Sequence, residues 1–202
     1  MDWIVSFFLV ILRPALGLIF LAGFLLCWIL KKKLLKEKFL KLILYIFSGV
    51  IIFQSVFYTI FNWWLWSQQG ISQRLLPPHS PINYVLKYSW QHYWFESIII
   101  IITAAIVFFG IYFLNKKFEK NLFYNEEKYL AALGILSVGW PNCLIFLCLV
   151  LFLGVALHLI SFIFNKRRNR LSLFYFWIPC ALLTLLLSDI INKYIGVNQF
   201  II

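Results

Sequence analysis

The chain has 202 residues, of which 63% are hydrophobic and 12% charged, and its formal net charge is +11. Soluble domains are near half apolar and about a quarter charged, so this composition excludes an ordinary soluble globular domain. The apolar residues form unbroken blocks instead of the alternating pattern of membrane β-strands. We therefore predict an all-α fold, a polytopic helical integral membrane protein whose nearest partners are membrane lipids.

Positive charge gathers at the borders of the apolar blocks. Fourteen of the eighteen Lys and Arg residues fall within 31–41, 116–128 and 166–170. Under the positive-inside rule such clusters face the cytoplasm, and they also attract anionic lipid. No basic segment stands outside the apolar blocks as a platform for nucleic acid, so we predict no nucleic-acid partner.

Two long spans are predicted in the first third of the chain. The first covers residues 3–30, is interrupted by Arg13-Pro14 and ends at the first basic cluster. The second covers residues 42–66 and finishes in three tryptophans, which are typical of a membrane interface. Arg13 lies near the outer end of its span, where we expect its long side chain to reach the headgroups.

The rest of the chain alternates polar and apolar segments. Residues 82–95 are too polar and too short for a lipid-exposed span, which predicts an interfacial or re-entrant segment, and a clear span follows at 97–114. Residues 129–165 exceed the length of one span but contain Gly139-Trp140-Pro141. Because proline cannot continue a helix, we predict a helical hairpin with its break at Pro141. The last predicted span covers residues 172–191.

These segments form one predicted transmembrane domain, residues 1–202, with about four spans, a short hairpin and an interfacial segment. Each span exchanges the sides of the membrane, and this arrangement places all three basic clusters on the cytoplasmic side. A single crossing at 129–165 would instead turn the cluster at 166–170 outward. The positions of the charges therefore support the break at Pro141.

Few side chains of this chain could perform chemistry. The intramembrane polar residues are Arg13, His158 and Asp189. A buried histidine costs about 1–3 kcal/mol unless it is paired, so His158 is either functional or bonded to a neighbouring helix. His92 and Glu96 stand four residues apart, which favours a structural pair over half of a metal site. The four cysteines lie in apolar runs without a C-x-x-C pair, and we predict no metal and no cofactor.

Residues 124–140 read YNEEKYLAALGILSVGW. This stretch resembles the second active-site region of the type 4 prepilin peptidases, polytopic aspartic proteases of the bacterial inner membrane. In that family Gly-x-Gly-Asp-x-Lys precedes a Leu- and Ala-rich run that ends in Gly-Trp. The apolar run, basic loop and final span that follow here have the family's order, so the resemblance covers about residues 74–191.

Departures from the family pattern fall on the catalytic residues. An aspartic protease needs two carboxylates that share a proton. The family's first aspartate, in Leu-Pro-Asp, corresponds to Pro78, and the Gly-Asp of the second motif corresponds to Asn125-Glu126, while Lys128 matches the motif's lysine. No acid occurs from residue 38 to residue 95. The resemblance thus implies the peptidase scaffold without its catalytic pair.

The resemblance implies an inner-membrane, multi-pass, prepilin-peptidase-like protein that is a non-catalytic component or assembly factor of a pilus-like or protein secretion system. Protein partners in a membrane complex are then expected. One alternative is an active leader peptidase that uses Glu126 with a partner such as Glu96. Another is a small transporter or channel subunit whose intramembrane polar residues line a path. A structural interpretation of Glu126 and Glu127 is also open, because acids stabilise the N-terminus of a helix.

Overall fold

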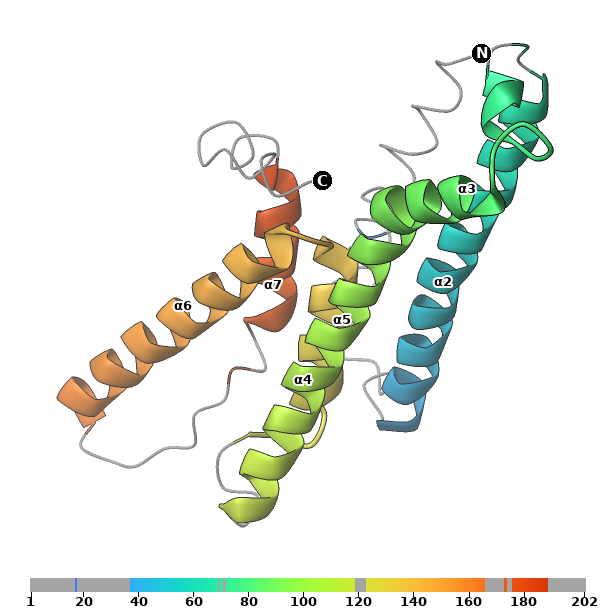
Figure 1. The fold of residues 1–202 in the computed structure, drawn as a ribbon. Helices are drawn as coiled ribbons and strands as arrows, with labels where there is room; N and C mark the ends of the chain where they lie inside the picture. The colour runs from blue at the N-terminus through green and yellow to red at the C-terminus, as the bar shows by residue number, and fades with distance from the viewer. Residues whose placement is uncertain are drawn as a thin grey trace.

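The structure, a computed structural model, describes residues 17, 37–68, 70, 72–118, 123–165, 173 and 176–188, with the side chains of residues 158, 161, 162, 164 and 165 outside that description. The described elements are all helical, which confirms the predicted all-α class. They are α2 (Glu37–Gln68), the 3-10 turn η2 (Ser72–Leu75), α3 (Ile82–Ser89), the π-helical turn η3 (Trp90–Trp94), α4 (Phe95–Lys117), α5 (Glu127–Val138), α6 (Asn142–Asn165) and α7 (Trp177–Leu186) (Figure 1).

Two of the described helices are long and apolar enough to cross a membrane. They are α2, with 32 residues, and the continuous helix Ile82–Lys117, with 36 residues, and they contain the predicted spans 42–66 and 97–114. The predicted number of about four spans is not supported. The first predicted span, 3–30, lies outside the described residues except for residue 17. The described apolar parts of α6 and α7 are shorter than the roughly 20 residues that a span needs.

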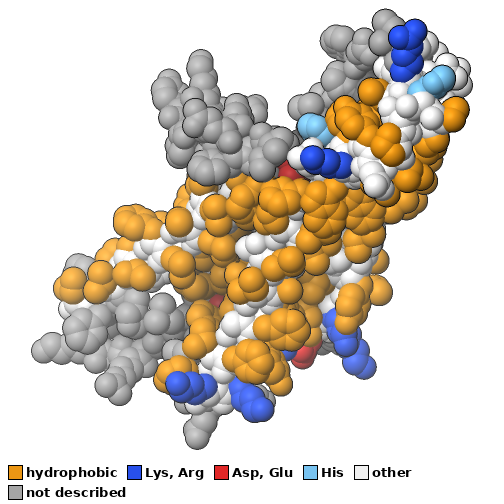
Figure 2. Space-filling view, viewed as in Figure 1, with side chains coloured by type: hydrophobic (Ala, Val, Ile, Leu, Met, Phe, Trp, Pro, Cys, Tyr) orange, Lys and Arg blue, Asp and Glu red, His pale blue; other side chains and the backbone are white. Residues whose placement is uncertain are grey.

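The outer surface of the long helices is apolar. Phe53 on α2, Ile106 on α4 and Phe152 on α6 are 69%, 66% and 73% exposed. Figure 2 shows hydrophobic side chains covering the middle of the bundle, with Lys and Arg gathered toward its ends. Water-soluble monomers rarely expose a continuous apolar surface of this kind, whereas a bilayer would cover it.

The predicted interfacial segment 82–95 forms α3 and η3, and α3 runs across the end of α4 at a steep angle (Figure 1). A π-helical turn shifts the backbone hydrogen-bond register and bends the helix. The carbonyl of Tyr93 accepts hydrogen bonds from the Ser97 hydroxyl at 3.0 Å and from the Ser55 hydroxyl at 3.3 Å. The two serine oxygens lie 2.8 Å apart, so this polar contact joins α2 to α4 at the bend.

Helix α5 is the centre of the bundle and packs against α2, α4, α6 and α7. It has 12 residues, about 18 Å of helix, and every one except Lys128 is buried. Alanines and Gly134 let its neighbours approach closely, and the Phe146 ring of α6 lies against Gly134. The helix ends at Gly139, whose φ of 81° suits glycine, and α6 begins at Asn142 after the predicted break.

Candidate functional site

The segment that resembles the peptidase motif lies at one end of the bundle, where α4 ends and α2 begins. The Asn115 side chain of α4 accepts a hydrogen bond from the Phe123 N–H at 2.9 Å, which returns the chain toward the bundle. Asn125 and Glu126 follow in a turn, and Glu126 is the residue that precedes α5. The motif residues thus surround the N-terminus of a buried helix.

Lys128 makes the central polar contacts of this end. Its Nζ lies 3.2 Å from Oε1 of Glu37, the first residue of α2, and the Tyr129 hydroxyl donates to the same oxygen at 3.1 Å. The ammonium also lies over the Tyr129 ring, 5.0 Å from its centroid, and near the rings of Phe108 and Tyr112. Glu37 therefore has two donors, and the lysine is held by a carboxylate and aromatic faces together.

Glu37 lies before the apolar part of α2, and Lys128 governs its protonation. The hydrogen bond and the positive charge of Lys128 hold the pKa of the Glu37 carboxyl below its ordinary value, with partial burial opposing them. A carboxyl with a lowered folded-state pKa stabilises the fold above its unfolded-state pKa and loses that contribution as the pH falls.

Replacing Glu37 by glutamine is therefore expected to lower the unfolding temperature near neutral pH but not well below about pH 4. Because Glu37 is half exposed, the substitution should lower the free energy of unfolding at neutral pH by less than about 1 kcal/mol. Thermal unfolding of both proteins across this pH range, followed by circular dichroism, measures it. Glu126→Gln is the control, and a difference that persists in acid would contradict the assigned contact.

Glu127, which the sequence analysis considered only as an acid at the N-terminus of a helix, is a site residue that it did not predict. It is fully buried, with 0% of its surface exposed. Its Oε1 accepts a hydrogen bond from the Tyr124 N–H at 3.1 Å, and its Oε2 lies 3.5 Å from the indole Nε1 of Trp177, which donates to it from α7. The sequence does contain one indication that Glu127 is buried. Glu127 lies on the same helix face as Leu130, Ala131 and Gly134, at the i, i+3, i+4, i+7 spacing typical of a buried face.

The structure does not bring the other predicted acids together. Glu96 lies in the first turn of α4, whereas Glu126 follows the other end of that helix. Asn125, the neighbour of Glu126, lines a pocket with Tyr112 and Asn115 of α4, so about 24–28 Å of helix separates this segment from Glu96. Pro78 precedes α3 and so lies toward the start of α4, whereas Asn125 lies beside the last turns of α4. The predicted pair of Glu96 with Glu126 therefore does not form one site.

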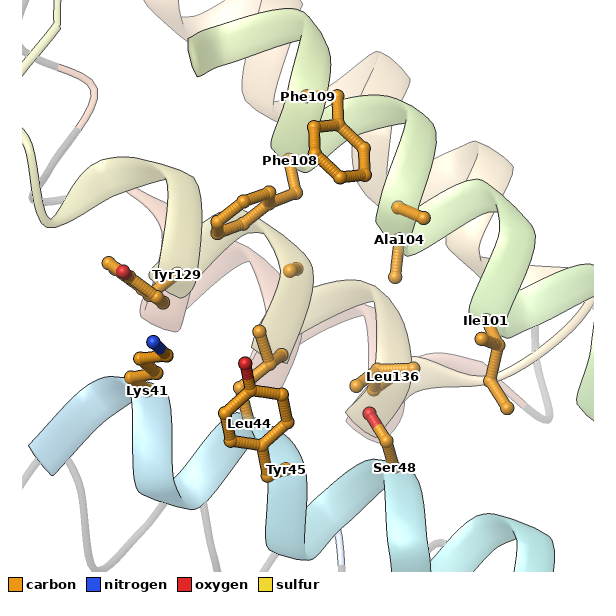
Figure 3. A pocket seen from close by; sticks show the side chains of 12 residues that line it. Lys41, Leu44, Tyr45, Ser48, Ile101, Ala104, Phe108, Phe109, Tyr129 and Leu136 are labelled. Atoms are coloured by element: carbon orange, nitrogen blue, oxygen red, sulfur yellow. The ribbon is translucent and has the colours of Figure 1, made fainter. Parts of the chain in front are cut away.

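Two adjoining cavities open beside the Glu37–Lys128 contact. The first, which we call the α2–α4 groove, has a volume of about 390 Å³ and lies between α2 and α4 with α5 as its floor (Figure 3). The second, which we call the polar pocket, also has about 390 Å³ and is lined by Glu37, Tyr112, Asn115, Lys116, Asn125 and Lys128. Tyr129 lines the groove and donates a hydrogen bond to Glu37, which lines the pocket, so the largely apolar groove and the cationic pocket lie side by side.

The remaining predicted polar residues lie elsewhere. Arg13, Asp189 and the side chain of His158 fall outside the described residues. Within the described part of the chain, no three His, Cys, Asp or Glu side chains gather in a way that could hold a metal ion. The Tyr88 and His92 rings have centroids 4.3 Å apart, so His92 packs against an aromatic ring in the bend before α4.

Comparison with known proteins adds no support to the resemblance to the prepilin peptidases, which is based on the residues quoted above. No family model, no curated protein and no solved structure matches this chain.

Proposed function

We propose that this chain is a multi-pass protein of the bacterial inner membrane that resembles a prepilin peptidase in the order of its sequence segments but does not cleave. In this role it binds partner proteins as a non-catalytic component or assembly factor of a pilus-like or protein secretion system. The observation that carries the proposal is the contact of Lys128 with Glu37, at 3.2 Å, beside the peptidase-like motif.

That contact matters because an aspartic protease must keep two carboxyl groups free to share a proton and activate water. Glu37 is engaged by the Lys128 ammonium and the Tyr129 hydroxyl. Glu127 is buried and accepts hydrogen bonds from the backbone of Tyr124 and from Trp177. Glu37 and Glu127 therefore bear structural contacts, which supports a scaffold role over amide hydrolysis.

The membrane location is supported by two further features. Two described helices have the length and apolar composition of spans, and their outer faces are apolar. Lys41, Lys116 and Lys128 lie at the end of the bundle where α5 begins. Under the positive-inside rule this end faces the cytoplasm, the side on which the related peptidases work.

The test uses the full chain in lipid nanodiscs with a synthetic substrate, an apolar helix preceded by a short basic leader. We expect binding without cleavage, while an authentic prepilin peptidase run in parallel cleaves the substrate. Cleavage that disappears in Glu126→Gln would replace the proposal with the active-peptidase alternative. A chain that neither binds nor cleaves would overturn both.

A further inference from the structure

The α2–α4 groove has the shape of a site for a single chain of apolar atoms. Ala104 and Ala105 line one wall and leave room between the two long helices. In Figure 3 Lys41 and Tyr129 lie at one end of the groove, and Ser48, Ile101 and Leu136 lie toward the other. One end is therefore cationic and the other largely apolar.

The charge at the cationic end is unbalanced. Lys41 lines the groove, and Lys116 and Lys128 line the adjoining polar pocket. Among the residues that line the two cavities, Glu37 is the one acid, and it is paired with Lys128. Lys41 and Lys116 thus add positive charge that the lining residues do not neutralise, and Asn115 and Asn125 add polar groups that can donate to an anion.

We propose that the α2–α4 groove and the polar pocket together bind one anionic phospholipid of the surrounding membrane. One of its acyl chains lies along Ala104 and Ala105, and its phosphate faces Lys41 and Lys116. The inference rests on the membrane location proposed above and not on the resemblance to the peptidases.

The dimensions of the groove favour a single acyl chain over the helix of a partner protein. A helix with its side chains is about 10–12 Å across and fills far more than the 390 Å³ of the groove. The volume falls instead in the range of small-molecule sites. Charge decides the class of lipid, because lysines at a membrane surface attract anionic headgroups. Each lysine raises the affinity about fivefold.

The experiment is native mass spectrometry of the full chain released from nanodiscs that contain equal amounts of phosphatidylglycerol and phosphatidylcholine. We expect one tightly retained phosphatidylglycerol. Lys41→Gln should reduce its retention about fivefold. Lys38→Gln should leave it unchanged, because Lys38 is an exposed lysine of the same helix that lines neither cavity. Equal losses in the two variants would show diffuse attraction and overturn the proposed site.

The apolar half of the site has its own pair of variants. Ala105→Trp should fill the groove and abolish retention, whereas Ile106→Trp, one residue along and exposed on α4, should retain the lipid. Circular dichroism verifies that both variants keep their helices. If Ala105→Trp does not fold, the comparison of Lys41→Gln with Lys38→Gln still tests the site. The proposal would be overturned if the protein retained the two lipids equally or retained neither. It would also be overturned if Ala105→Trp still retained phosphatidylglycerol. If the chain bound the synthetic substrate but retained no lipid, the lipid site would be wrong and the proposed function would be unaffected.

Discussion

Replacing Gly134 by alanine is expected to lower the free energy of unfolding by about 1–3 kcal/mol, because α5 and α6 leave no space for a methyl group there. A Cβ at this position would lie 2.6 Å from Cζ of the Phe146 ring. That ring cannot withdraw easily, since it is fully buried and packs against Trp177 with 6.0 Å between ring centroids. Denaturation of the purified protein in detergent, followed by circular dichroism, measures the loss.

The matched control for this prediction is Gly110→Ala in α4, where a Cβ would meet no atom within 4 Å. That variant measures the gain in helix propensity alone, up to about 1 kcal/mol. A second substitution, Phe146→Leu, should recover part of the stability that Gly134→Ala loses, because it removes the opposing ring atoms. If Gly134→Ala were as stable as Gly110→Ala, the close approach of α5 to α6 would be wrong.

Replacing Glu127 by leucine is expected to destabilise the fold by about 1–3 kcal/mol, the cost of leaving a buried donor without an acceptor. The donor is the indole N–H of Trp177, which reaches Glu127 Oε2 at 3.5 Å. The Tyr124 N–H loses its acceptor as well. Glu127→Gln should cost less, because the amide oxygen can still accept a hydrogen bond. Chemical denaturation of the three proteins measures the order of stability.

Glu126→Leu is the control, because Glu126 is the partly exposed neighbour and its loss should change stability by less than about 0.5 kcal/mol. Combining Glu127→Leu with Trp177→Phe removes both partners, so the double variant should be more stable than the sum of the single losses predicts. Additive losses would mean that the carboxylate and the indole do not interact.

Much of the local structure could be predicted from the chain alone. The apolar blocks predict helices of the α2 and α4 type, because a backbone in lipid must satisfy its hydrogen bonds internally. The end of α5 at Gly139 and the start of α6 at Asn142 follow from the proline between them. The steep turn between α3 and α4 agrees with the polar character of residues 82–95.

The assignment of roles to the acids could not be predicted in the same way. Glu126 and Glu127 are adjacent and chemically identical, and the one that is fully buried was selected by the packing of α5 against α7. Glu37 became a site residue through Tyr129 and Lys128, although Tyr129 lies 92 residues away along the chain. Helical periodicity reports which residues share a face of one helix, but it carries no information about the helix opposite.

By itself, then, the sequence determined the helical class, the apolar lengths of α2 and α4 and the break before α6, since each depends on residues that are neighbours along the chain. Only the tertiary structure decided that Glu127 is enclosed, that Lys128 meets Glu37 and that a groove beside them ends in unbalanced lysines. The physical reason is that burial and ion pairing depend on distances between helices, and those distances are set by the packing of all the helices around α5.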